Sequence, residues 1–325
     1  MPRTSRSGAA RAQRRPGRRH PGSREAPTLP AGAVAIDTGS ASVERDPDRP
    51  HLVTLHVNGV PSSALDLDDP GFLAFEYMQQ MAAVLAAMPG GPLRVLHLGA
   101  AGCALARHVE HERPGSRQLG VDIDARLLAL VREWFDLPRS PALRLRADDA
   151  GRALASVRPA SFDVVVRDVF AGDRTPDHLA DAAFAHAAHR ALRPGGVLLA
   201  NCADRPPLSL ARREVATLAG VFGADAADAG RLAAVAEPGV LKGRRYGNVV
   251  LAAVRAPAGD ADPGPEGDPA DAADGRGAPV DAEPGLDLAA PAVVRALRSL
   301  AVPAQLLAGG DVTRFAGLPA PSAGH

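Results

Sequence analysis

The feature that most constrains the fold is a repeated alternation of short strand-like runs with segments of helical periodicity, joined by short loops rich in small residues. Strands that alternate with helices on short loops predict a parallel sheet with helices on both faces. Such a sheet binds its ligand at the carboxyl ends of its strands. The expected strands lie at 93–98, 118–121, 143–146, 162–166, 197–200 and 247–252, and the expected helices at 105–112, 125–135, 152–157, 180–192 and 209–219.

A different pattern precedes this alternation. Between 33 and 67, short runs of alternating apolar and polar residues are separated by turn signals, among them Asn58-Gly59, which favours a hairpin. We therefore expect a small antiparallel β unit. Asp68-Asp69-Pro70 then opens a helix over 72–88, and Pro89-Gly90-Gly91 ends it.

A small-residue loop after the first strand of the alternation is the first candidate site. Gly99, Ala100, Ala101 and Gly102 follow that strand, and Asp122 and Ile123 follow the next one about twenty residues later. A glycine turn lets a ligand approach the backbone, and an acid at the end of the second strand accepts hydrogen bonds from ribose hydroxyls. The alternative for each piece alone is a tight turn and a helix-capping aspartate. Together they predict a nucleoside site.

A third acid narrows the choice of ligand. The loop lacks the full Gly-x-Gly-x-x-Gly spacing of dinucleotide sites, and Asp148-Asp149-Ala150 stands at the end of the third strand. Nucleoside pockets of the methyltransferase type place an acid there, near the adenine, and we expect Asp149 with Ala150 in that role ahead of Asp148. The predicted fold is a Rossmann-like, methyltransferase-type, doubly wound α/β sheet with a small N-terminal antiparallel β unit, and the predicted ligand is S-adenosylmethionine or a relative.

Asp168 is the candidate catalytic residue. It stands at the carboxyl end of the fourth strand, where a carboxylate can orient an attacking amine and accept its proton. The alternative is that Asp168 caps the loop over 171–176. Asp163 begins the same strand and is expected to be structural, while Arg167 either pairs with a neighbouring acid or points outward at the sheet edge.

The composition limits which partners, cellular locations and metal or disulfide sites can be expected. The chain has 37 basic and 37 acidic residues, so no overall field indicates a nucleic-acid or anionic-membrane partner. Its basic start lacks the apolar stretch of a secretory signal, and no run is long enough to span a bilayer, so we expect a cytoplasmic location. Cys103 and Cys202 are too few for a disulfide framework, and the histidines lack partners for a metal site.

Two segments, one at the start of the chain and one before its last forty residues or so, differ in composition from the rest. Residues 1–30 are rich in Arg, Pro and Gly, and 257–287 are rich in Ala, Asp, Gly and Pro, so neither segment can bury enough apolar surface to fold. We expect both to be dispensable for folding. The predicted organisation is a disordered basic tail (1–30), an N-terminal β unit (31–70), a Rossmann-like nucleoside-binding domain (71–256), a disordered acidic linker (257–287) and a C-terminal helical appendage (288–325).

Taken in order, these motifs resemble the spermidine synthase family over roughly residues 33–254, most closely its divergent bacterial members. The resemblance extends to Leu192-Arg193-Pro194-Gly195-Gly196. It implies transfer of an aminopropyl group from decarboxylated S-adenosylmethionine to a polyamine or other small amine, without a metal. It also implies that Asp122 binds ribose, that Asp149 lies on the adenine side and that Asp168 is the base.

On the acceptor side the resemblance implies further residues. Glu76 would match the glutamate of the family's Tyr-His-Glu stretch, while Ala74 stands near its tyrosine. Ala171 replaces the second aspartate of the family's Asp-Ser-x-Asp-Pro motif, with Asp173 displaced in sequence. Tyr246 could supply a substitute aromatic ring for binding an amine.

Two departures keep other functions open. Ser62 or Ser63 replaces a glutamine after the hairpin, and the loop from Gly99 to Ala104 lacks the family's aspartate. That aspartate excludes the carboxylate of S-adenosylmethionine, so a loop offering only backbone amides favours an S-adenosylmethionine-dependent methyltransferase as the alternative. A non-catalytic nucleoside-binding relative is the third possibility, and the assembly could be a homodimer.

Overall fold

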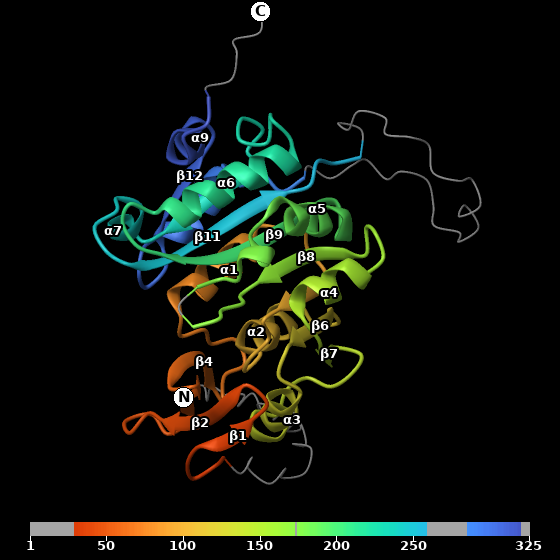
Figure 1. Ribbon diagram of the computed structural model, residues 1–325, viewed down its shortest axis with the longest axis vertical. Helices are drawn as coiled ribbons and strands as arrows, with labels where there is room; N and C mark the ends of the chain where they lie inside the picture. Colours follow the sequence, from red (N-terminus) through yellow and green to blue (C-terminus); the bar gives the residue numbers. More distant parts are fainter. Residues whose placement is uncertain (1–28, 173, 259–284, 320–325) are drawn as a thin grey trace, which may run out of the picture.

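The structure is a computed structural model that describes residues 29–172, 174–258 and 285–319. Its centre is an eight-stranded sheet in the order β12-β10-β11-β9-β8-β5-β6-β7 (Figure 1). Strands β5 to β9 run parallel, and β10, β11 and β12 add an antiparallel edge. The strands are β5 (Arg94–Leu98), β6 (Arg117–Asp122), β7 (Leu143–Ala147), β8 (Phe162–Arg167), β9 (Leu192–Asp204), β10 (Leu232–Ala236), β11 (Gly247–Val254) and β12 (Gln305–Ala308).

Helices cover both faces of this sheet, as the alternation predicts. Successive strand residues point to opposite faces, so Val95 joins the core on one face and Leu96 the core on the other. One face carries α1 (Glu76–Ala86), α2 (Ala104–Glu112), α3 (Ala125–Trp134) and α8 (Pro291–Arg298). The other carries α4 (Ala150–Ser156), α5 (Ala182–Ala191), α6 (Ser209–Phe222) and α9 (Gly310–Ala316), while η1 (Asp177–Leu179) and α7 (Pro238–Leu241) lie in connections. The predicted doubly wound sheet is confirmed.

The N-terminal β unit is an antiparallel sheet at one end of the molecule (Figure 1). Asn58 and Gly59 both have positive φ, at 52° and 77°, which is the geometry of a two-residue hairpin turn. The unit is attached to the large sheet near its strand ends, because the Thr38 amide and hydroxyl both donate to Asp124 at 2.7 and 2.8 Å. Its strands are β1 (Val34–Ile36), β2 (Gly39–Arg45), β3 (Leu52–Val57) and β4 (Val60–Asp66).

The C-terminal part differs from the prediction. Residues 288–325 were expected to form a helical appendage, but β12 pairs with β10 and extends the central sheet. Strand β10 was not predicted because its sequence, Leu-Ala-Ala-Val-Ala, is poor in the β-branched and aromatic residues typical of strands. Leu286, inside the predicted acidic linker, is buried in the core.

Three predictions fall wholly or mainly on residues that the structure does not describe. The basic tail lies outside the described residues except for 29 and 30, and the acidic linker except for 257, 258 and 285–287. Asp173 also lies outside them. Within the described ranges, every helix is too short or too polar to cross a membrane.

Candidate active site

The predicted site residues meet at one edge of the central sheet. β8, β5, β6 and β7 are neighbours and run parallel, so Asp168, Gly99, Asp122 and Asp148 follow four adjacent strand ends. Strands are spaced by about 4.8 Å, so the row extends about 14 Å from β8 to β7. An elongated ligand lying across these ends can therefore contact all four.

Gly99 of the loop lies directly against the backbone of Asp168. Its φ is +83°, and a Cβ atom there would lie 2.1 Å from the backbone oxygen of Asp168. Only glycine fits this space and this backbone conformation. Ala101 and Cys103 also have positive φ, at 37° and 59°, which is uncommon for residues with side chains.

The loop amides are already engaged within the protein. Gly99 and Ala100 N–H donate to the Val121 oxygen at 2.9 and 3.0 Å, and Cys103 N–H donates to the Ala100 oxygen at 2.7 Å. Ala101 N–H donates to Asp122 Oδ2 at 3.1 Å, and Gly102 N–H to Ser63 Oγ at 3.0 Å. The five donors from Gly99 to Cys103 are therefore satisfied before any ligand binds.

Asp122 lies at the centre of the row and is half-buried. Its two oxygens accept from the Ala101 and Asp124 amides, both at 3.1 Å. Burial raises the pKa of Asp122, and these hydrogen bonds partly offset the rise. A carboxylate has about four lone-pair sites, so it can still accept from ribose hydroxyls. Next to it, the Ile123 side chain is 66% exposed and offers an apolar surface at the strand end.

The two acids after β7 have different surroundings. Asp148 is paired with Arg146 and Arg152, whose hydrogen bonds outweigh burial and hold its pKa below the usual value. Asp149 caps α4 by accepting from the Arg152 amide at 2.9 Å, and its other oxygen lies 3.6 Å from His178 Nε2. Asp149 is thus the acid with an oxygen left for a ligand, whereas Ala150 is buried beneath it.

Asp168 is held by two side chains from distant parts of the chain. Tyr77 on α1 donates its hydroxyl to Oδ2 at 2.8 Å, and Asn201 on β9 donates its amide to Oδ1 at 2.9 Å. Burial raises the pKa of Asp168, and the bonds from Asn201 and Tyr77 partly offset that rise. Burial and the neighbouring Asp168 charge raise the pKa of Tyr77 well above its usual value, so Tyr77 remains a donor.

A buried ion pair lies behind this carboxylate. Arg167 is fully buried and pairs with Glu214 on α6, so it does not point out at the sheet edge. It also donates to the Asn201 oxygen and the Leu179 oxygen, each at 2.8 Å. Arg167 therefore holds the backbone of Asn201, and the side-chain amide of Asn201 orients Asp168.

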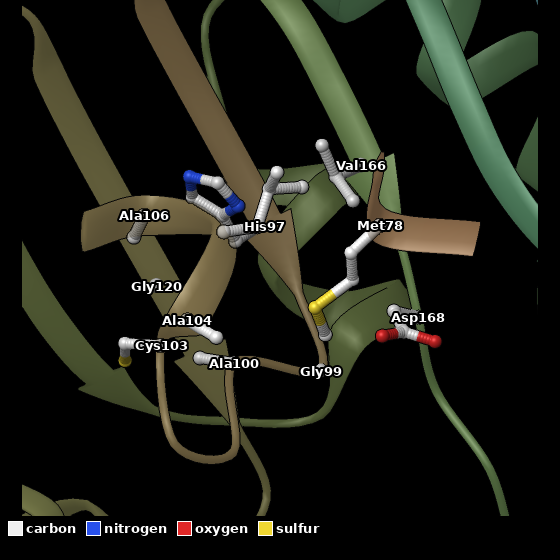
Figure 2. A pocket seen from close by; sticks show the side chains of 11 residues that line it. Met78, His97, Gly99, Ala100, Cys103, Ala104, Ala106, Gly120, Val166 and Asp168 are labelled. Carbon is white, nitrogen blue, oxygen red and sulfur yellow. The ribbon is translucent and has the colours of Figure 1, made fainter. Parts of the chain in front are cut away.

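A small cavity of about 20 Å³ lies between α1, the loop and β8. Figure 2 shows the Met78 side chain reaching from α1 toward Gly99 and Ala100, with the Asp168 carboxylate on its other side. His97 also lines the cavity; burial lowers its pKa to about 4, so it is neutral at ordinary pH. Asp168 is thus the charged group facing an otherwise apolar space.

The acceptor-side residues proposed from sequence do not cluster around Asp168 as the nucleoside-side residues cluster at the strand ends. Glu76 is exposed at the first position of α1, and Tyr246 is 50% exposed just before β11. Tyr77 lies three residues after Ala74, and its hydroxyl donates to Asp168. The match of Glu76 to the family's glutamate stays a prediction. Sequence reasoning missed Tyr77 and Asn201. The available signals were that Tyr77 is one of two tyrosines in the chain and that Asn201 interrupts an apolar strand.

A comparison with solved structures decides the family. The crystal structure of a probable spermidine synthase from Corynebacterium glutamicum is 34% identical in sequence, with a TM-score of 0.74 and coverage of 92% of this chain and 98% of that one. The chain belongs to the spermidine synthase family. The resemblance inferred from the motifs is therefore confirmed, and this divergent family member shares its fold over nearly the whole of its relative.

Curated relatives agree on the family but match a shorter stretch. A polyamine aminopropyltransferase of Chromobacterium violaceum is 30% identical over 139 residues, which are 43% of this chain and 53% of the relative. One of Neisseria meningitidis is 27% identical over 152 residues, 46% of this chain and 58% of the relative. The chain thus matches little more than half the length of these relatives. No protein-family model matches the chain.

Proposed function

We propose that the chain transfers an aminopropyl group from decarboxylated S-adenosylmethionine to a small amine. The observation that carries this proposal is the position of Asp168, which Tyr77 and Asn201 hold at the end of β8 against Gly99 of the predicted nucleoside loop. A base in contact with the donor loop is what an attacking amine requires.

The reaction would be a direct displacement. The amine nitrogen forms a bond to the donor carbon next to the sulfonium, the carbon–sulfur bond breaks, and its electron pair stays on sulfur as the neutral thioether methylthioadenosine. The proton lost by the nitrogen passes to Asp168 and then to solvent. The raised pKa of Asp168 suits this role, because a carboxylate with a higher pKa is a stronger base.

The loop amides support the decarboxylated donor. A methyltransferase must accommodate the carboxylate of S-adenosylmethionine, and that alternative relies on the backbone amides of the loop from Gly99 to Ala104. The five amides from Gly99 to Cys103 donate to protein acceptors, so a carboxylate that binds any of these five would have to replace one of these bonds. A donor that lacks the carboxylate has no such cost.

The donor would lie along the strand ends. We assign the loop of Gly99, Ala100, Ala101 and Gly102 to the nucleoside backbone contact and Asp122 to the ribose. Ile123 would pack against the adenine ring, and Asp149 with Ala150 would lie at its polar edge. The catalytic base is Asp168, positioned by Tyr77 and Asn201, with Asp173 and Glu76 as further acceptor-side candidates. Homodimer formation and a cytoplasmic location remain predictions.

The test is a product assay with two donors. Purified protein is incubated with a panel of amines and either decarboxylated S-adenosylmethionine or S-adenosylmethionine, and methylthioadenosine and S-adenosylhomocysteine are quantified. We expect methylthioadenosine from the first donor alone. S-adenosylhomocysteine from the second donor would establish the methyltransferase instead. Tight methylthioadenosine binding by calorimetry without either product would leave the non-catalytic relative.

A further inference from the structure

A charged pair is buried in an apolar part of the core directly behind the base. Arg167 follows Val165 by two residues on β8 and therefore points to the same face, whose core is otherwise apolar. Arg167 is fully buried, and Glu214 on α6 is only 5% exposed. The guanidinium lies 5.8 Å from the centre of the Phe184 ring. Two charges in such surroundings need a physical reason, because burial removes both from water.

The guanidinium of Arg167 is held by four hydrogen bonds. Its two terminal nitrogens donate to the two carboxylate oxygens of Glu214, the bond from Nη2 being 3.2 Å long. The same nitrogens also donate to the backbone oxygens of Leu179 and Asn201, each at 2.8 Å. One planar group therefore joins β8 to α6, to η1 and to β9, and its orientation is fixed.

Stability alone does not account for this network. Replacing a buried ion pair with apolar residues of similar volume is often neutral or stabilising. The network also contains two buried atoms, Arg167 Nε and Asn201 Oδ1, that have no hydrogen-bond partner among the residues the structure describes. Buried polar atoms without partners lower stability. The network must therefore contribute something that an apolar core could not.

The network acts on Asp168 in two ways. Arg167 holds the backbone of Asn201, whose side-chain amide donates to Asp168 Oδ1 at 2.9 Å. Burial raises the pKa of Asp168, and the positive charge of Arg167 is one of the influences that oppose this rise. Glu214 limits the effect of Arg167, because its negative charge partly cancels the positive one.

The other ionisable side chains near this network do not replace it. Tyr77 on α1 has a strongly raised pKa and stays a neutral donor, and burial lowers the pKa of His97 on β5 to about 4. Burial raises the pKa of the Cys202 thiol on β9 to about 12, so this group is neutral as well. Arg213 on α6 is exposed, so solvent screens its charge. The ion pair thus supplies the buried charge beside the base.

We propose that the Arg167–Glu214 pair is a positioning device for the reaction, which orients Asp168 through Asn201 and keeps its carboxylate ionised, and that the fold does not need the pair for its stability. The proposal rests on aminopropyl transfer as the proposed function. Both members act through other residues, so they are positioning residues, and Asp168 remains the base.

The first test replaces both members of the pair with apolar residues. Arg167→Met combined with Glu214→Leu removes both charges together, so the urea midpoint and the methylthioadenosine affinity should match those of the wild type. We expect kcat to fall about tenfold at neutral pH, because Asn201 loses its anchor and the base its orientation. Without Arg167 the pKa of Asp168 should rise, so the acid limb of the kcat/KM profile should move to higher pH.

The second test should shift the profile in the opposite direction. Glu214→Gln keeps the shape of the side chain but removes the charge that opposes Arg167, so the pKa of Asp168 should fall and the acid limb should move to lower pH. Asp225→Asn is the matched control, because it removes the carboxylate that pairs with Arg231 at 2.6 Å at the opposite edge of the sheet. Its profile should match that of the wild type. Acid limbs that move in the same direction in both pair variants would overturn the proposal.

An NMR titration separates this proposal from the proposed function. The side-chain carboxyl carbon of Asp168 is assigned by its loss in Asp168→Asn, and its titration midpoint is measured without substrates in the wild type and in both pair variants. Midpoints displaced in opposite directions support the positioning role even if the product assay finds no aminopropyl transfer. A midpoint that neither variant moves, or a double variant that does not fold, overturns the proposal whatever the assay finds.

Discussion

The nucleoside half and the acceptor half of the candidate site are built in different ways. The nucleoside half comprises the strand ends of β5, β6 and β7, where carboxylates and loop amides bond mostly to the backbone of their own neighbourhood. The acceptor half comprises the ends of β8, β9 and β11, where Asp168 depends on Tyr77, 91 residues away, and Asn201, 33 residues away. The first half is therefore preorganised mostly by local bonds, whereas the second is assembled from distant segments of the chain.

The largest effect should follow from removing the base. Asp168→Asn keeps the size and some hydrogen bonding of the side chain but cannot take a proton, so turnover should fall about a hundredfold or more. Methylthioadenosine affinity, measured by calorimetry, should stay near wild type because the nucleoside half is untouched. Asp163→Asn, at the opposite end of β8, is the matched control and should retain turnover. A fully active Asp168→Asn protein would make Asp173 or Glu76 the next candidate.

The second prediction tests the nucleoside half, where a substitution should weaken binding of the nucleoside. Asp122→Ala removes the acceptor of the Ala101 amide and of the proposed ribose contact, so methylthioadenosine affinity should fall about tenfold or more. Calorimetric titration measures the loss. Asp228→Ala, at an exposed turn remote from the strand ends, should bind as wild type does. Unchanged affinity in Asp122→Ala would reject Asp122 as the ribose ligand.

A smaller effect is expected from removing the hydrogen bond that Tyr77 on α1 donates to Asp168. Tyr77→Phe removes a hydrogen bond that lowers the pKa of Asp168. The pKa should therefore rise further, and Asp168 should be protonated at higher pH. The acid limb of the kcat/KM profile should move toward higher pH, with a loss in kcat of about fivefold at neutral pH. Phe75→Leu removes the ring stacked on Tyr77 but leaves the Tyr77 hydroxyl in place, so the pH profile of this variant should match that of the wild type. A profile that Tyr77→Phe leaves in place would show that this hydroxyl does not tune the base.

The smallest effect concerns the attachment of the N-terminal sheet to the loop. Ser63→Ala leaves the Gly102 amide without its acceptor and should lower the free energy of unfolding by about 1–2 kcal/mol. Urea denaturation measures this change. Ser62→Ala is the control, because the Ser62 hydroxyl is exposed and donates to the nearby Val60 oxygen. Equal stability of the two variants would mean that Gly102 finds another partner.

The same contrast explains what could be predicted from sequence. The alternation, the Gly99 loop, Asp122 and Asp149 follow from local patterns, and the structure places them at adjacent strand ends. Tyr77 and Asn201 were missed, because their sequence signals do not show which helix and which strand pack beside Asp168. Strands β10 and β12 were missed because their alanine- and leucine-rich sequences do not distinguish strand from helix over four or five residues.

The position of β12 has a consequence for handling the protein. β10 consists of five buried apolar residues, and β12 occupies one of its two hydrogen-bonding edges. If the chain were shortened before Gln305, that edge would carry unpaired amides and carbonyls beside uncharged side chains, a combination that promotes strand-to-strand self-association. We therefore expect the segment over 285–319 to protect the sheet from aggregation, so that a chain shortened to end at Val254 precipitates while one that reaches Gly317 stays dispersed.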